Sequence, residues 1–86
     1  MSQPYRHGRL MGRGENGLWS VLDGETGIEH SLNDSARAIW ELCDGNTTVD
    51  EMAAAVAELT GMPTDDALRD VVRALDDLKG LGLVRQ

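Results

Sequence analysis

The first candidate for a functional motif in this chain is a glycine-rich run. Residues 12–17 read GRGENG and match GxGxxG, the spacing with which a dinucleotide-binding loop approaches a pyrophosphate. In such a site the glycines follow a buried strand and open a helix, whereas the residues after Gly17 are LWSVLD, which alternate as a strand does. We therefore interpret the run as a hairpin turn built on the dipeptide Asn16-Gly17.

The other candidates for chemistry are two histidines and one cysteine. His7, His30 and Cys43 do not have the spacing of metal ligands. Cys43 lies on the apolar stripe of a predicted helix, where a cysteine is commonly a small core residue. No pair of acids has a spacing that suggests a shared acid–base site. The sequence predicts no catalytic residue, no metal site and no cofactor, and a protein that is not an enzyme.

The segment 32–45, LNDSARAIWELCDG, predicts a strand end that runs directly into a helix. Asn33 can cap that helix with its side-chain oxygen, and the charge of Asp34 suits the positive end of the helix dipole. An apolar stripe with helical spacing follows at Ala36, Ile39, Trp40 and Cys43. Gly45 is a natural stop.

Three strands are predicted before this helix, over residues 9–13, 18–22 and 28–32. The turns between them, 15–17 and 23–27, are rich in residues that tolerate positive φ. Together they form an antiparallel meander, which needs helices against it to be stable.

Two more helices are predicted after it. One begins at the capping box Thr48–Glu51 and ends near Gly61, and the longest opens at Pro63 and ends at Gly80. The apolar tail 81–84 is expected to fold back on the core. The predicted fold class is α+β and winged helix-turn-helix-like, with a three-stranded antiparallel sheet followed by three α-helices. We expect one domain over residues 1–86, with a flexible segment over residues 1–8.

Composition and charge restrict the partners. The chain has 86 residues, one cysteine and no apolar run near the roughly 20 residues of a membrane span, so we expect a soluble, cytoplasmic protein. The formal net charge is −7, although the first 14 residues hold three arginines and no acid. An acidic body repels nucleic acids and anionic membranes, and neither is a predicted partner.

The charge of the predicted third helix argues against a DNA-binding function. Residues 64–79 carry three basic residues and five acidic ones, and a recognition helix should be basic. A winged-helix DNA-binding protein and a non-catalytic structural subunit of an enzyme complex remain the alternatives to a peptide-binding module.

The peptide-binding hypothesis rests on strand 27–32. If this strand lies at the edge of the sheet beside the longest helix, an extended peptide can add to it as a further strand. The other interpretation is an edge that is merely protected, with Glu29 discouraging aggregation.

Several motifs in order resemble the PqqD family, whose members and fused relatives are called RiPP recognition elements. The resemblance covers about residues 18–84 and rests on LNDSARAIWELCDGNTTVDEMAAAVAEL and on a last helix ending DDLKGLGLV. It implies a peptide chaperone that binds the leader of a ribosomally made precursor peptide and presents it to a modifying enzyme. That enzyme would be a radical S-adenosylmethionine enzyme, a leader peptidase or a cyclase.

The resemblance also implies where the leader lies, namely as an added strand between the third strand and the third helix. Carried onto this sequence, the peptide-binding residues are Ile28, Glu29, His30, Ser31, Arg69, Val72, Arg73 and Asp76. The basic segment around Arg6, Arg9 and Arg13 is a candidate surface for the enzyme on charge grounds. We expect a monomer or a weak homodimer.

Overall fold

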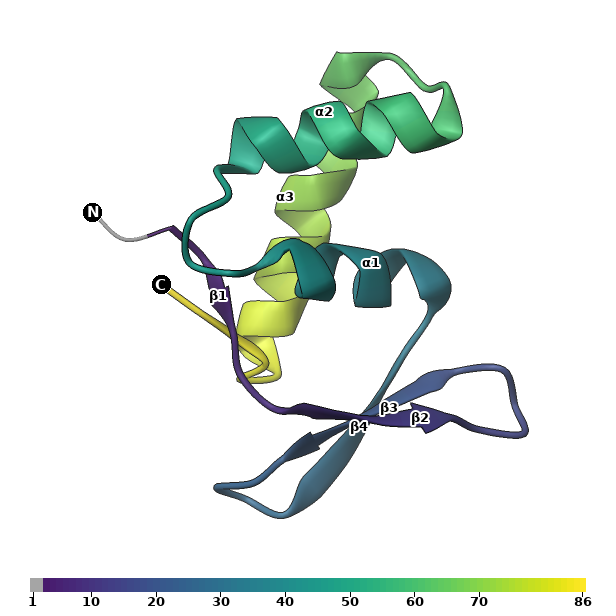
Figure 1. The fold of residues 1–86 in the computed structure, drawn as a ribbon, viewed down its shortest axis with the longest axis vertical. Helices are drawn as coiled ribbons and strands as arrows, with labels where there is room; N and C mark the ends of the chain where they lie inside the picture. Colours follow the sequence, from purple (N-terminus) through teal and green to yellow (C-terminus); the bar gives the residue numbers. More distant parts are fainter. Residues whose placement is uncertain (1–2) are drawn as a thin grey trace.

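The computed structural model describes residues 3–86, and the elements follow the predicted order (Figure 1). They are β1 (Tyr5–Arg6), β2 (Arg9–Arg13), β3 (Trp19–Asp23), β4 (Ile28–Leu32), α1 (Asp34–Leu42), α2 (Val49–Thr60), α3 (Thr64–Gly80) and β5 (Val84–Arg85). The predicted α+β architecture, a three-stranded antiparallel sheet followed by three helices, is confirmed. No helix among the described residues is long and apolar enough to span a bilayer.

The sheet has the order β2-β3-β4, so β2 and β4 are its two edges. All five residues of β4 pair in register with β3. The register of β2 shifts at Met11, which forms a β-bulge. The run GRGENG forms the hairpin turn between β2 and β3, as predicted, with the N–H of Gly17 donating to the carbonyl of Gly14 at 3.0 Å.

The helix boundaries follow from the caps expected from the sequence. The side chain of Asn33 accepts a hydrogen bond from the N–H of Ala36 at 2.8 Å, and Thr48 and Glu51 form the reciprocal capping box of α2. α2 ends where Gly61 takes a left-handed conformation at φ 75°. The core lies between the three helices and one face of the sheet. Its buried apolar residues are Val21, Leu32, Ile39, Trp40, Cys43, Met52, Ala53, Ala67, Val71, Leu75, Leu78, Leu83 and Val84.

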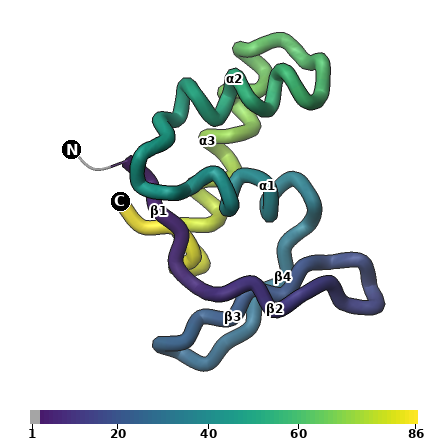
Figure 2. The backbone as a smooth tube through the Cα atoms, viewed as in Figure 1, coloured from purple at the N-terminus to yellow at the C-terminus, as the bar shows by residue number. Residues whose placement is uncertain are grey.

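A second, two-stranded sheet joins the ends of the chain, where β1 pairs with β5 (Figure 1, Figure 2). The N–H of Arg6 donates to the carbonyl of Cys43 at 2.7 Å, and the N–H of His7 donates to that of Leu83 at 2.8 Å. Residues 5–7 therefore pair with α1's C-cap and with the tail. Flexibility over residues 1–8 stays a prediction, and residues 1–2 of that segment lie outside the described residues. The predicted return of the tail to the core is confirmed, because Leu83 and Val84 are buried.

Among the described residues, Asp23 is the acidic residue that is buried. It links His7, which follows β1, to the turn between β3 and β4. Its Oδ1 accepts hydrogen bonds from the Nε2 of His7 at 3.0 Å and from the N–H of Glu25 at 2.9 Å. The hydrogen bond from His7, opposed by burial and supported by the N–H groups of Glu25 and Thr26, lowers the pKa of Asp23 below its ordinary value of 3.8.

This shift predicts a loss of stability in acid. A carboxyl whose pKa is lower in the folded state stabilises the fold above its unfolded pKa of about 3.9, and the contribution is lost as the pH falls through the folded pKa. We expect the free energy of unfolding, measured with urea at steps from about pH 6 to about pH 2, to fall more steeply for the wild type than for Asp23→Asn. Parallel curves for the two proteins would show that the Asp23 carboxylate does not support the fold.

Candidate functional site

The outer edge of β4 is open. β4 has β3 on one side, and on the other side no strand of residues 3–86 pairs with it. No backbone hydrogen bond within this range joins the outer edge to a loop, and the tail that could have covered it pairs with β1 instead. Ile28, at the start of the strand, is 53% exposed. Extended backbone is therefore available for pairing.

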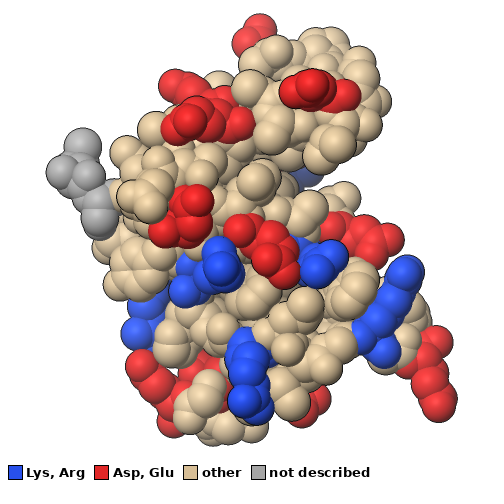
Figure 3. All heavy atoms as spheres, viewed as in Figure 1, with Lys and Arg blue, Asp and Glu red and all other residues tan. Residues whose placement is uncertain are grey.

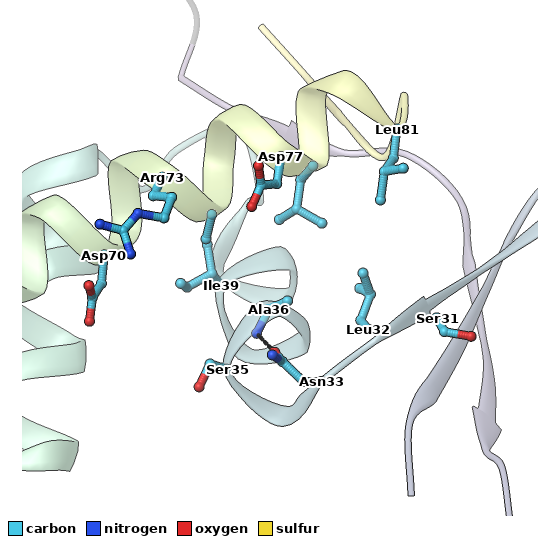
Figure 4. Close-up of a pocket in the computed structure, with 12 residues that line it drawn as sticks. Ser31, Leu32, Asn33, Ser35, Ala36, Ile39, Asp70, Arg73, Asp77 and Leu81 are labelled. Carbon is cyan, nitrogen blue, oxygen red and sulfur yellow. Dashed lines mark hydrogen bonds between the residues drawn. The ribbon is translucent and has the colours of Figure 1, made fainter. Parts of the chain in front are cut away.

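Next to this edge lies the first hollow, of about 460 Å³, between the end of β4, α1 and the C-terminal half of α3 (Figure 4). It is lined by Ser31, Leu32, Asn33, Ser35, Ala36, Ile39, Asp70, Arg73, Ala74, Asp77, Leu78 and Leu81. Buried Leu32, Ile39 and Leu78 form an apolar floor. In Figure 4, Leu81 points from α3 toward Leu32 across the opening. The hollow can accept an apolar side chain of a peptide that runs along β4.

The charged groups on the rim are not paired with one another. Among residues 3–86, Arg73 has no carboxylate within 4.0 Å, although Asp70 and Asp77 lie one helical turn away on either side. Arg69, by contrast, forms an ion pair with Asp66 on its own helix. The Arg73 guanidinium and the two rim carboxylates are thus free to pair with charges on a ligand.

A second hollow, of about 550 Å³, lies on the outer side of α3 and is lined by that helix alone. Its lining residues are Leu68, Arg69, Val72, Arg73, Asp76 and Asp77. Arg73 and Asp77 line both hollows, so the two are adjacent.

The residues predicted from the sequence are divided between these places. Ser31 and Arg73 line the first hollow. Three others, Arg69, Val72 and Asp76, line the second hollow together with Arg73. The remaining three, Ile28, Glu29 and His30, line neither hollow and lie along β4.

Sequence reasoning missed the part of the first hollow that α1 contributes, and it missed Asp70 and Asp77 of α3 and Leu81, the residue that follows this helix. A signal for the α3 residues exists, since positions 70, 73, 77 and 81 recur at helical spacing along one flank of the apolar stripe. The predicted residues 69, 72 and 76 lie on the opposite flank. Spacing alone cannot say which flank faces β4.

The other groups considered for chemistry have structural partners. Cys43 is buried, its Sγ–H donates to the carbonyl of Ile39 at 3.2 Å, and burial raises the pKa of the thiol to about 11. Ligand atoms of His7, Asp23 and Glu25 lie within 4.8 Å of one another. However, His7 bonds to Asp23, and Glu25 binds the guanidinium of Arg85 at 3.0 and 3.3 Å.

A comparison with models of known protein families assigns the chain to one of them. The family model described as coenzyme PQQ synthesis protein D (PqqD) matches residues 19–84 of the 86. The chain belongs to the PqqD family. Searches of curated proteins and of solved structures gave no match. The matched range contains β3, β4, all three helices and both hollows, and it leaves out β1 and β2.

Membership implies a role in binding a precursor peptide in RiPP biosynthesis of the PQQ type, together with a partner enzyme. PqqD-family proteins are non-catalytic accessory proteins.

Proposed function

We propose that this PqqD-family chain binds the leader segment of its precursor peptide as a fourth strand on β4 and presents the peptide to the modifying enzyme. The observation that carries the proposal is the open edge of β4 lying directly beside the first hollow. Backbone hydrogen bonds along the edge supply affinity, and the hollow supplies selectivity for side chains.

The two edges of the sheet are not equivalent, and the difference favours β4. β2 carries a bulge at Met11, and Arg9 and Arg13 flank it. Bulges and basic side chains are features that discourage a further strand from pairing. β4 keeps a regular register with β3 over its whole length, so its outer backbone groups are evenly presented.

Side chains of the leader would then be sorted by alternation. Residues of an added strand point alternately to the two faces, so every second leader residue is directed toward the helices. An apolar residue there enters the first hollow against Leu32, Ile39 and Leu81. Arg69, Val72 and Asp76 contact the leader where it continues from the first hollow over α3, past Arg73.

We expect the leader to bind reversibly, because the entropy that it loses on docking limits its affinity. A disordered leader loses conformational freedom when it docks, and this loss offsets much of the gain from contacts. Burial of one leucine-sized side chain in the hollow contributes about 1.5–3 kcal/mol, or roughly one to two orders of magnitude in affinity. Such a complex is tight enough to select the precursor and weak enough to release the product.

Two exposed leucines provide a matched test. Leu81 is 41% exposed on the rim of the first hollow, and Leu59 is 82% exposed at the end of α2, outside both hollows. We expect Leu81→Gln to weaken leader binding about tenfold, because a polar amide replaces an apolar contact, and Leu59→Gln to change it less than about twofold. Titration calorimetry with the synthetic leader of the cognate precursor measures both. Equal effects of the two substitutions would place the binding site away from the first hollow.

A further inference from the structure

Four arginines lie on elements that do not line the groove, around the β2 edge of the sheet. This arginine face consists of Arg6 on β1, Arg9 and Arg13 on β2, and Arg37 on α1. Figure 3 shows basic side chains over β1, β2 and α1, with acidic side chains between them, above them over α2 and below them at the ends of the sheet. The face holds half of the eight basic residues of a chain whose net charge is −7.

Two tryptophans hold three of these guanidinium groups in place. The Cζ of Arg37 lies 4.3 Å, and that of Arg13 lies 5.5 Å, from the ring centroid of Trp19. The Cζ of Arg6 lies 5.9 Å from the ring centroid of Trp40. Stacking on an aromatic ring restrains the guanidinium plane.

Part of each N–H edge is already used, since Arg6 Nη1 donates to the carbonyls of Glu41 at 3.2 Å and Cys43 at 3.4 Å, and Arg13 Nε donates to that of Gly17 at 3.1 Å. A guanidinium has five N–H groups, so the remaining ones can donate to a partner. Tryptophan and arginine are also the residues enriched at the centres of protein interfaces.

The guanidinium of Arg37 is partly enclosed by Trp19 and Glu41. Its Nε is buried and lacks a hydrogen-bond partner among residues 3–86, while one of its Nη groups pairs with Glu41 at 3.3 Å.

The carboxylates within the arginine face do not cancel its charge. Asp34 accepts the indole N–H of Trp19 at 2.8 Å and lies 3.8 Å from Arg13. Glu41 is paired with Arg37. Asp44 lies beside Arg6, and the two line a shallow hollow together. Four guanidinium groups against these three carboxylates still leave the face positive.

Helix α1 separates the arginine face from the groove. Ser35, Ala36 and Ile39 line the first hollow. At 100° per residue, Arg37 and Glu41 lie on the opposite flank of the same helix. β2 is likewise the sheet edge farthest from β4. A leader in the groove therefore leaves the arginine face uncovered.

We propose that the arginine face docks an acidic surface of the modifying enzyme while the leader occupies the groove. The proposal uses the partner enzyme that family membership implies, and it does not depend on where the leader binds. Charge complementarity of this kind acts mainly on the association rate and on the orientation of the complex, and it weakens with salt.

The first test uses a defined acidic probe, an eight-residue glutamate peptide, and ¹⁵N spectra of the labelled full chain. At about 50 mM salt we expect the indole N–H signal of Trp19 and the amide signals of β2 to shift, and at about 500 mM the shifts should vanish. An eight-residue glutamine peptide should cause no shift. Arg13→Glu should abolish the response, whereas Lys79→Glu, with the same change in charge on α3, should preserve it. A response equal in both variants, or centred on α3, would overturn the proposal.

The second test uses the cognate modifying enzyme, immobilised on a sensor surface, and measures the association rate of this chain at low salt. We expect Arg13→Glu to lower the rate by about tenfold and Lys79→Glu by less than about twofold. Leader affinity, measured without the enzyme, should remain within about twofold in Arg13→Glu. If leader affinity falls together with enzyme binding, Arg13 belongs to the leader site and the docking proposal is wrong. If enzyme binding is unaffected, the enzyme docks elsewhere, and the leader groove stands or falls on its own test.

Discussion

A proline in β4 is expected to abolish leader binding while the domain stays folded, provided that it replaces a residue whose N–H points outward. Proline removes the N–H and places its ring against the incoming strand, so an added strand loses a hydrogen bond and meets a steric clash. Consecutive N–H groups of an edge strand point alternately toward the neighbouring strand and away from it. His30→Pro and Ser31→Pro therefore form a pair in which one variant keeps the fold and loses the ligand.

We expect that variant, Ser31→Pro in the simplest case, to bind the leader at least about tenfold more weakly than the wild type by titration calorimetry. Its partner should instead lower the free energy of unfolding, because it breaks a hydrogen bond to β3. Met11→Pro is the matched control, because Met11 is the bulge residue of the opposite sheet edge. Full affinity in both β4 variants, with loss in Met11→Pro, would move the docking edge to β2.

Trp40→Ala is expected to cause the largest loss of stability among single substitutions. Trp40 is 3% exposed, and its indole N–H donates to the carbonyls of His7 at 3.2 Å and Leu83 at 3.0 Å. The side chain thus ties α1 to both ends of the chain. Truncating a buried tryptophan costs about 3–5 kcal/mol, which is a large part of the stability of a domain of this size.

Urea unfolding followed by circular dichroism measures this loss, and Trp19→Ala is the control. Trp19 is only half-buried and donates to the exposed carboxylate of Asp34, so we expect a cost well below that of Trp40→Ala. Trp40→Phe should give an intermediate value, since it keeps most of the apolar volume and removes the two hydrogen bonds. Equal losses in the free energy of unfolding at the two tryptophans would mean that the hydrogen bonds from Trp40 to His7 and Leu83 contribute little to stability.

The parts of the fold that local rules determine could be predicted from the sequence. The caps at Asn33 and Thr48, the Asn16-Gly17 turn and the three strands of the main sheet each depend on neighbouring residues, and the structure contains all of them. The pairing of β1 with β5 could not be predicted, because each strand has two residues and shows no periodicity. Residue type alone is likewise no guide to burial at Leu59 and Val72, which are apolar residues of α2 and α3 and are both exposed.

The groove could be predicted only in part, for a related reason. The strand wall follows from the element order, since a third strand that leads into a helix without a return strand is left at an edge. The helix wall depends on how α3 crosses α1, which is set by packing over the whole core rather than by the sequence of α3. This is why Arg73 was found, while Asp77 and Leu81 became visible only in the structure.

The central claim is that the leader docks along β4, and an amide-resolved titration of the ¹⁵N-labelled chain with the synthetic leader tests it most directly. We predict shifts concentrated in residues 27–32, in the residues of α1 that line the first hollow, and in residues 64–81. New contacts between backbone protons of the leader and those of β4 should accompany them. Saturable shifts confined to β2 or to α2, with β4 unperturbed, would contradict the account.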